Sequence, residues 1–184
     1  MDSFTGWTRN VMDHYKDKSV EEIREELKST AHPFAVLMEN WKGDFNLSTM
    51  IRNANGFNAK EVFYFGKKKF DRRGAVGSYH YVNLQHLSNF DKVLQLKKEY
   101  WFIGIDNNVG KRKSRSLEEP NLWENILAKI GNNMNPLFIF GEEGEGITGP
   151  LLDLCDVLVD IPMFGSVRSF NEQNNLMQIS LIII

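Results

Sequence analysis

A glycine-rich, acidic loop directly follows an apolar run at Phe140-Gly141-Glu142-Glu143-Gly144-Glu145-Gly146-Ile147-Thr148-Gly149. Glycines at such spacing after a strand are typical of the turns where an α/β fold brings its backbone close to a ligand. The apolar run 137–140 precedes the loop, and a second apolar run, 157–161, follows it. The segment therefore predicts a strand, a ligand-binding turn and a further strand of an α/β fold.

The composition of this loop restricts its ligand. Gly144, Gly146 and Gly149 match G-x-G-x-x-G, and Asp160 follows at the end of the next apolar run, as in a dinucleotide-binding fingerprint. A pyrophosphate would meet three carboxylates there without a cation to offset them, and no Lys-Ser or Lys-Thr pair follows for a P-loop. A flexible acidic turn stays open as an alternative. A positively charged ligand fits better, and S-adenosylmethionine carries a sulfonium and an ammonium.

Apolar runs alternate with amphipathic segments along most of the chain. Short continuous apolar runs predict strands covered on both faces, and apolar residues at helical spacing predict helices between them. This alternation indicates an α/β fold with a mostly parallel sheet and helices on both faces. The predicted strands are 34–38, 62–65, 101–105, 137–140 and 157–161. The predicted helices are one that Asn46 caps and Gly56 ends, one that Ser88 caps, 122–130 and 171–184.

The N-terminal part of the chain predicts a separate helix. Ser19 and Glu22 form a capping box, and Val20, Ile23 and Leu27 recur at helical spacing. The helix 20–29 stops before a His-Pro pair, because the residue before a proline disfavours helix. Residues 1–33 are therefore interpreted as a helical appendage.

Length and composition exclude several classes of protein. The chain has 184 residues, 42% hydrophobic and 25% charged, as expected for one folded domain. Its one cysteine, Cys155, excludes an intrachain disulfide and Cys-rich metal sites, and we expect it to be a small buried apolar residue. No His/Asp/Glu group has metal-ligand spacing, so we expect no metal. Neither a signal peptide nor a membrane span is indicated, and we expect a cytoplasmic protein.

Charge is segregated although the net charge is only -2. Segment 60–73 carries six basic residues, a second cluster lies at 111–115, and 137–160 has six acidic residues and no lysine or arginine. Each basic cluster alone is an ordinary solvated loop. Together, after different strands of one parallel sheet, they can form a phosphate-binding rim. The candidate contacts are Lys68, Lys69, Arg72, Arg73, Lys111 and Arg112.

Three segments together resemble the SpoU (TrmH-like) branch of the SPOUT RNA methyltransferases. Segment 46–57, Asn-Leu-Ser-Thr-Met-Ile-Arg-Asn-Ala-Asn-Gly-Phe, is similar to the first family motif, in which an arginine follows an asparagine by six residues. Segment 141–147 resembles the second motif, G-N-E-G-x-G-L, and segment 161–171 resembles the third, I-P-M-x-G-x-x-x-S-L-N. Their order and spacing also agree, so the resemblance covers about 34–184.

The resemblance implies a SPOUT methyltransferase domain over 34–184 with a deep C-terminal trefoil knot. It implies methyl transfer from S-adenosylmethionine to a ribose 2′-hydroxyl of tRNA or rRNA, so the implied partner is RNA. Arg52 is the implied catalytic arginine. The implied supporting polar residues are Asn46, Glu143, Ser169 and Asn171, and the implied cofactor contacts are Gly141, Ile161, Met163 and Phe170.

The segment after Asn171 departs from the family pattern. The family continues with small and β-branched residues, whereas this chain has Glu-Gln-Asn-Asn-Leu-Met at 172–177. A non-catalytic, knotted RNA- or cofactor-binding relative is therefore the alternative to an enzyme. The C-terminal segment is apolar on more than one side, through Leu176, Ile179 and Ile183 with their neighbours. One sheet cannot cover all of it, so we expect a homodimer through this helix, as the resemblance also implies.

Overall fold

The computed structural model describes residues 9–42, 45–106, 112–130, 134–142 and 145–164. Seven strands form one sheet in the order β3-β2-β1-β6-β4-β7-β5, and every pairing between them is parallel. The strands are β1 (His32–Asn40), β2 (Ala59–Gly66), β3 (Leu84–Leu87), β4 (Tyr100–Ile105), β5 (Arg115–Ser116), β6 (Asn135–Phe140) and β7 (Val157–Asp160). The helices are α1 (Val20–Ser29), α2 (Phe45–Gly56), α3 (Phe90–Leu96), α4 (Leu122–Leu127) and α5 (Gly149–Leu154), with 3₁₀ turns η2 (Asp13–Tyr15), η3 (Arg73–Ala75) and η4 (Ser78–His80).

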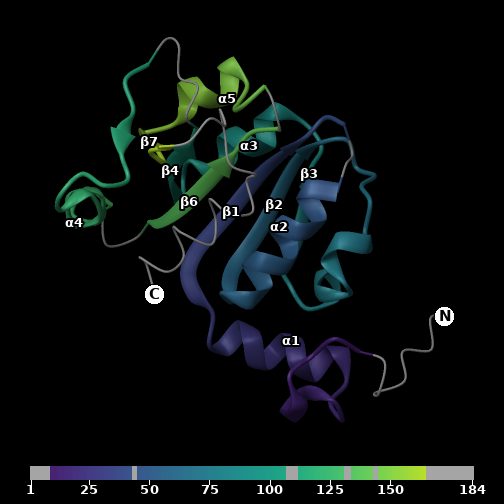
Figure 1. Ribbon diagram of the computed structural model, residues 1–184. Coiled ribbons are helices and arrows are strands. Elements are labelled where there is room, and N and C mark those ends of the chain that lie inside the picture. Colours follow the sequence, from purple (N-terminus) through teal and green to yellow (C-terminus); the bar gives the residue numbers. More distant parts are fainter. Residues whose placement is uncertain (1–8, 43–44, 107–111, 131–133, 143–144, 165–184) are drawn as a thin grey trace.

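Helices cover both faces of the sheet (Figure 1). In β1, the even-numbered residues Val36 and Met38 pack in one core cluster with residues of α2 and α4. The odd-numbered Ala35 and Leu37 pack in a second cluster with Val93 of α3 and residues of α5. Successive strand residues point to opposite faces, so a continuous apolar run is what a doubly covered strand requires. The predicted parallel sheet with helices on both faces is confirmed.

The predicted elements agree with the structure in place but differ at some ends. The helix 20–29 is confirmed with its capping box, in which the Ser19 hydroxyl accepts from the Glu22 amide. The cap of α3 is Asn89 and not Ser88, because the Asn89 side chain accepts from the Lys92 amide at 3.1 Å. Likewise α2 begins at Phe45, which places Asn46 in its first turn. Cys155 is buried as predicted.

Helix α1 lies at the edge of the sheet where the strands begin (Figure 1). Asn58 donates to the carbonyl oxygen of Leu27 at 3.1 Å, and Arg24 donates to that of His80 at 2.5 Å. The division into an appendage, 1–33, and a domain, 34–184, stays a prediction. The predicted knot and the helix 171–184 lie outside the described residues.

Candidate functional site

The edge where the parallel strands end gathers the polar residues of the predicted site. Strand β6 lies between β1 and β4, so the glycine-rich loop after β6 emerges between the ends of its two neighbours. Ligands of open α/β sheets bind at this carboxyl edge. The segments that meet there follow β1 at Trp41, β2 at Lys67, β4 at Asp106, β6 at Gly141 and β7 at Ile161.

Two carboxylates from the neighbouring strands hold the glycine-rich loop. Asp106, after β4, accepts from the Ile147 amide at 2.7 Å. Glu39, near the end of β1, accepts from the Thr148 amide at 2.8 Å and from the Thr148 hydroxyl at 2.6 Å. These amides would otherwise be available to an anion. The loop is therefore bound by negative groups through the donors that a phosphate cradle would use.

Glu39 is fully buried, with 0% of its surface exposed. Its desolvation raises the pKa of the carboxyl, the hydrogen bonds from Thr148 and Trp41 oppose that rise, and nearby Glu142 adds to it. A buried carboxylate is tolerated when donors satisfy it, and Glu39 accepts three hydrogen bonds. The residue joins the end of β1 to the far end of the loop.

Glu142 makes a second connection between β1 and the loop. The side chain is 6% exposed, and its carboxylate accepts from the Lys42 backbone amide. The Lys42 ammonium lies 3.9 Å from the other carboxylate oxygen. Together with Glu39 and Asp106, this residue gives the site a concentration of negative charge beside the glycines.

Two glycines of the loop are required by close backbone packing. A Cβ added at Gly141 would lie 1.9 Å from the carbonyl carbon of Gly146. Gly146 itself has φ +70°, and its Cβ would lie 2.5 Å from an Asp106 carboxylate oxygen. Any side chain at either position would displace the loop. The glycine pattern thus has a structural cause that is independent of any ligand.

The predicted residues of the first motif lie on α2, which runs back from the carboxyl edge. Asn46 is buried in the first turn, and Arg52 is exposed. Six residues correspond to about 9 Å along a helix, so Arg52 lies about two turns from the edge. Arg52 makes no hydrogen bond or ion pair with other residues in the part of the chain that the structure describes. Its guanidinium is therefore available to a ligand.

The first basic cluster is fixed between β2 and α2. A Cβ at Gly74, in η3, would lie 2.4 Å from the Ser48 hydroxyl oxygen, so this turn packs directly on α2. Arg72 lies over the Tyr79 ring at 5.1 Å. Arg73 pairs with Asp71 at 2.6 Å, and this contact lowers the Asp71 pKa to about 2.

Arg112 of the second cluster lies on the other face. Its guanidinium donates to the Leu152 carbonyl oxygen in α5 at 3.1 Å, whereas Arg72 and Arg73 flank the turn on α2. Arg112 and the turn with Arg72 and Arg73 therefore lie over opposite faces of the sheet.

The remaining predicted residues divide into three groups. Ile161 is buried and Met163 half-buried directly after β7, at the same edge as Gly141. Lys68 and Lys69 are exposed in the turn after β2. Outside the described residues lie Lys111, Glu143, Ser169, Phe170 and Asn171.

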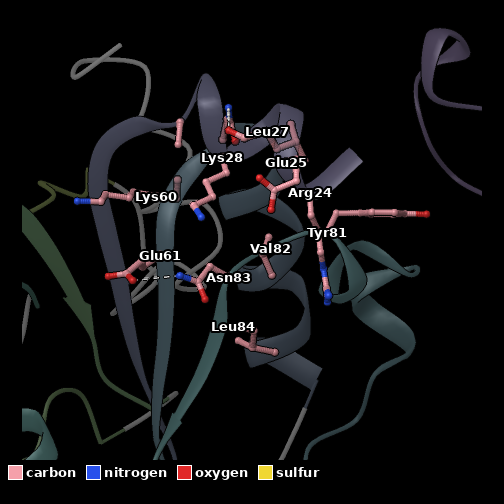
Figure 2. A pocket seen from close by; sticks show the side chains of 13 residues that line it. Arg24, Glu25, Leu27, Lys28, Lys60, Glu61, Tyr81, Val82, Asn83 and Leu84 are labelled. Carbon is pink, nitrogen blue, oxygen red and sulfur yellow. Dashed lines mark hydrogen bonds between the residues drawn. The ribbon is translucent and has the colours of Figure 1, made fainter. Parts of the chain in front are cut away.

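A separate groove of about 580 Å³ lies at the opposite, amino edge of the sheet (Figure 2). It runs between α1 and the starts of β2 and β3, and Figure 2 shows Asn83 donating to Glu61 on its wall. Its lining mixes Lys28 and Lys60 with Glu25 and Glu61. None of the residues predicted for the site lines this groove, which places it apart from the glycine-rich loop.

The family model for the SpoU rRNA methylases matches residues 33–175. The chain belongs to the SpoU family. This match covers β1, α2 and the glycine-rich loop, so the motifs that carry the resemblance lie within it.

Individual relatives in the SpoU family are distant. The tRNA (guanosine(18)-2′-O)-methyltransferase of Aquifex aeolicus is 24% identical over 160 residues, which cover 84% of this chain and 70% of that protein. The chain spans 34% to 70% of the length of its first curated relatives.

Solved structures share the fold. The crystal structure of the Aquifex aeolicus TrmH/SpoU tRNA modifying enzyme superposes with a TM-score of 0.66 at 18% identity, covering 88% of this chain and 79% of that one. The SpoU methyltransferase AviRb from Streptomyces viridochromogenes, solved in complex with AdoMet, has a TM-score of 0.60 at 20% identity, covering 80% and 55%.

Glu39 and Asp106 are the residues of this site that the sequence motifs did not indicate. Each is an acidic residue at the carboxyl end of a continuous apolar run, after Met38 and after Ile105. Acidic side chains are rarely buried unless they are partnered, so a charge that ends a doubly covered strand is a usable signal. Among the described residues, no group of three His, Cys, Asp or Glu side chains is arranged to hold a metal ion, and no helix is long and apolar enough to cross a membrane.

Proposed function

We propose that this protein is an S-adenosylmethionine-dependent methyltransferase that acts on a ribose 2′-hydroxyl of tRNA or rRNA. The observation that carries the proposal is the glycine-rich loop at the carboxyl edge, whose amides at Ile147 and Thr148 are already bound by Asp106 and Glu39. Because these amides are already occupied, they are not free to bind the phosphates of a dinucleotide. The loop's carboxylates favour a cation.

The proposed cofactor fits this loop by charge and by shape. Its sulfonium and ammonium are positive, Glu142 is part of the loop, and Glu39 and Asp106 accept hydrogen bonds from the loop backbone. Gly141 allows the loop backbone to close on Gly146, which fixes the shape of the loop. Gly141, Ile161 and Phe170 would hold the cofactor through loop backbone, and Met163 would line the adenine pocket.

In this reaction the protein mainly has to position the reacting groups and stabilise the developing charge. When bound, the cofactor would supply the methyl group of its sulfonium and leave as S-adenosylhomocysteine, and the proton of the 2′-hydroxyl would pass to water. A guanidinium stays protonated, so Arg52 is a poor general base. We assign it to the neighbouring phosphate and to the negative charge that develops on the 2′-oxygen. Asn46, Glu143, Ser169 and Asn171 are assigned to the polar groups that support it.

RNA is the proposed partner, and the basic cluster beside α2 is its proposed contact. Lys68, Lys69, Arg72 and Arg73 lie on the α2 side, which also exposes Arg52. Lys111 and Arg112 are proposed for a second stretch of RNA, since Arg112 lies over α5. Phosphate contacts release counterions, so reversing Arg72 and Arg73 to glutamate would weaken RNA binding and flatten its salt dependence.

Three further proposals accompany this function. The chain forms a homodimer through its C-terminal helix, works in the cytoplasm and needs no metal. A non-catalytic relative that binds RNA or cofactor without turnover is the second candidate, which the altered segment 172–177 favours.

Calorimetry tests the cofactor proposal directly. S-adenosylmethionine should release or absorb heat on binding and raise the melting temperature, because a ligand that binds the native state stabilises it. NAD, titrated under the same conditions, should do neither. Binding of NAD, or no heat with millimolar S-adenosylmethionine, would overturn the assignment.

A further inference from the structure

An exposed tryptophan lies next to the basic turn at the carboxyl edge. Trp41 follows β1 directly and is 40% exposed, and it is the one exposed tryptophan among the described residues. Single exposed apolar side chains are common on protein surfaces, so exposure alone assigns Trp41 no role. What distinguishes Trp41 is that its ring is held by a hydrogen bond and by ring packing next to the lysine-bearing turn.

The ring of Trp41 is held in place by its neighbours. Its indole N–H donates to Glu39 at 3.2 Å, and its ring packs nearly perpendicular to the Phe65 ring, with the ring centres 5.1 Å apart at 81°. A Cβ at Gly66 would lie 3.2 Å from the indole, so the β2 end also closes against it. A ring fixed in this way loses little conformational entropy when another flat group stacks on it.

Asn40 connects Trp41 to the turn that carries three lysines. Asn40 is 2% exposed, its carbonyl oxygen accepts from the Lys67 amide at 2.7 Å, and its side chain donates to the Lys67 carbonyl oxygen at 2.6 Å and to that of Lys69 at 3.4 Å. Gly66 makes this approach possible, because its φ is +113° and its Cβ would lie 2.7 Å from the Asn40 carbonyl oxygen. The turn 67–69 is thus attached to the residue before Trp41.

We propose that Trp41 and the exposed lysines Lys67, Lys68 and Lys69 form a binding site for one unpaired nucleotide and its phosphates in single-stranded RNA. The base stacks on the indole, and the ammonium groups contact the flanking phosphates. Unpaired bases are recognised by stacking on aromatic side chains in a positively charged groove. A protein or duplex partner is disfavoured, because a single fixed ring next to a lysine-bearing turn matches a splayed base better than a continuous apolar or helical surface. The inference rests on the proposed RNA substrate and names how that RNA is held.

The test compares short labelled RNAs by fluorescence anisotropy. One is an unstructured ten-nucleotide strand, the second is the same strand with abasic residues, and the third is a duplex of equal length. Stacking contributes about 5- to 150-fold per base, so wild-type protein should bind the intact strand more tightly than the abasic strand by a factor in this range. Trp41→Ala should bind both equally, and duplex binding should not change.

Three variants separate stacking from other causes. Trp41→Phe also loses the hydrogen bond to Glu39 but keeps a ring, and it should retain affinity within a few-fold. Leu94→Ala removes an equally exposed apolar side chain from α3 and should have no effect. The double variant Lys68→Ala/Lys69→Ala should weaken the intact and abasic strands equally and reduce the salt slope by about 0.7 per lost phosphate contact.

The RNA-binding measurements decide whether the proposed nucleotide site exists. Equal binding of intact and abasic RNA by the wild-type protein, no measurable RNA binding at low salt, or loss of duplex binding in Trp41→Ala would overturn the proposal. Calorimetry with S-adenosylmethionine on the wild-type protein separates this result from the proposed enzyme. Cofactor binding with no stacking effect rejects only the nucleotide site, whereas a stacking effect without any cofactor binding rejects only the methyltransferase.

Discussion

Glu39 is a buried carboxylate whose position shows how single residues organise this site. Its desolvation would be costly alone, and hydrogen bonds from Thr148 and Trp41 offset that cost. Through those bonds Glu39 links the glycine-rich loop, the proposed cofactor site, to the proposed base-stacking ring. One side chain therefore fixes parts of both proposed ligand sites.

Stability should depend on pH through Glu39. Because the pKa of this carboxyl is raised in the folded state, its contribution to stability is full below the ordinary glutamate pKa of about 4.3 and is lost as pH rises through the folded value. Glu39→Gln does not titrate. The melting temperature of the wild type relative to Glu39→Gln should therefore be highest near pH 4 and fall towards pH 8. A difference that stays constant, or that rises with pH, would contradict this account.

Arg52 should matter for the reaction and not for the cofactor. Removing one group that stabilises a developing negative charge costs about 100- to 1,000-fold in turnover, so Arg52→Ala should lose methyl transfer by at least about 100-fold. S-adenosylmethionine affinity should stay within a few-fold, as measured by calorimetry. Arg24→Ala, which alters an arginine on α1 at the opposite edge, is the control. If Arg52→Ala lost affinity and turnover together, its role would be structural.

At the scale of elements, long apolar runs were predictable and short elements were not. Helix α1 was predicted at its full extent, and β1, β2, β4, β6 and β7 were found from their buried runs, although the structure extends β1 to Glu39 and Asn40. The two-residue β5 and the six-residue α5 carry too few residues to show a period. The sequence motifs singled out Gly141 and Arg52 as candidate site residues. The contacts of Glu39 and Asp106 to the loop cross between strands, so they depend on the strand order.

The glycine-rich loop allows a matched pair of substitutions. Gly141→Ala would place its Cβ within 1.9 Å of Gly146, so the loop must shift, and we expect a loss of about 1–3 kcal/mol in stability and at least tenfold in S-adenosylmethionine affinity. Gly149→Ala has nothing within 4 Å of its Cβ and should change neither. Melting curves and calorimetry measure both. An unchanged Gly141→Ala protein would show that the loop is not the cofactor site.

On the scale of the whole molecule, strand order assembles the site. The last two strands of the described residues are inserted between strands that precede them in the sequence, since β6 lies between β1 and β4, and β7 lies between β4 and β5. Apolar periodicity contains no information about this order, because every covered strand has the same pattern. The sequence therefore predicted the fold class, whereas the placement of Glu39 and Asp106 on either side of the loop required the tertiary structure.

The predicted oligomeric state depends on the apolar C-terminal segment. At about 25 cal/mol per Å², an apolar helix face left in water would forgo several kcal/mol, comparable to the net stability of a domain. We expect a homodimer, and light scattering behind size exclusion at micromolar concentration measures its mass. A species of 21.3 kDa alone, the mass of one chain, would reject the dimer.

Nucleoside analysis after methyl transfer tests the central proposal most directly. Unmodified tRNA and rRNA are incubated with the protein and S-adenosylmethionine carrying a deuterated methyl group, digested to nucleosides and examined by mass spectrometry. The account predicts label on the ribose of a 2′-O-methylnucleoside with the wild-type protein and at least about 100-fold less with Arg52→Ala. Label on a base, or no label from a protein that binds both cofactor and RNA, would contradict it.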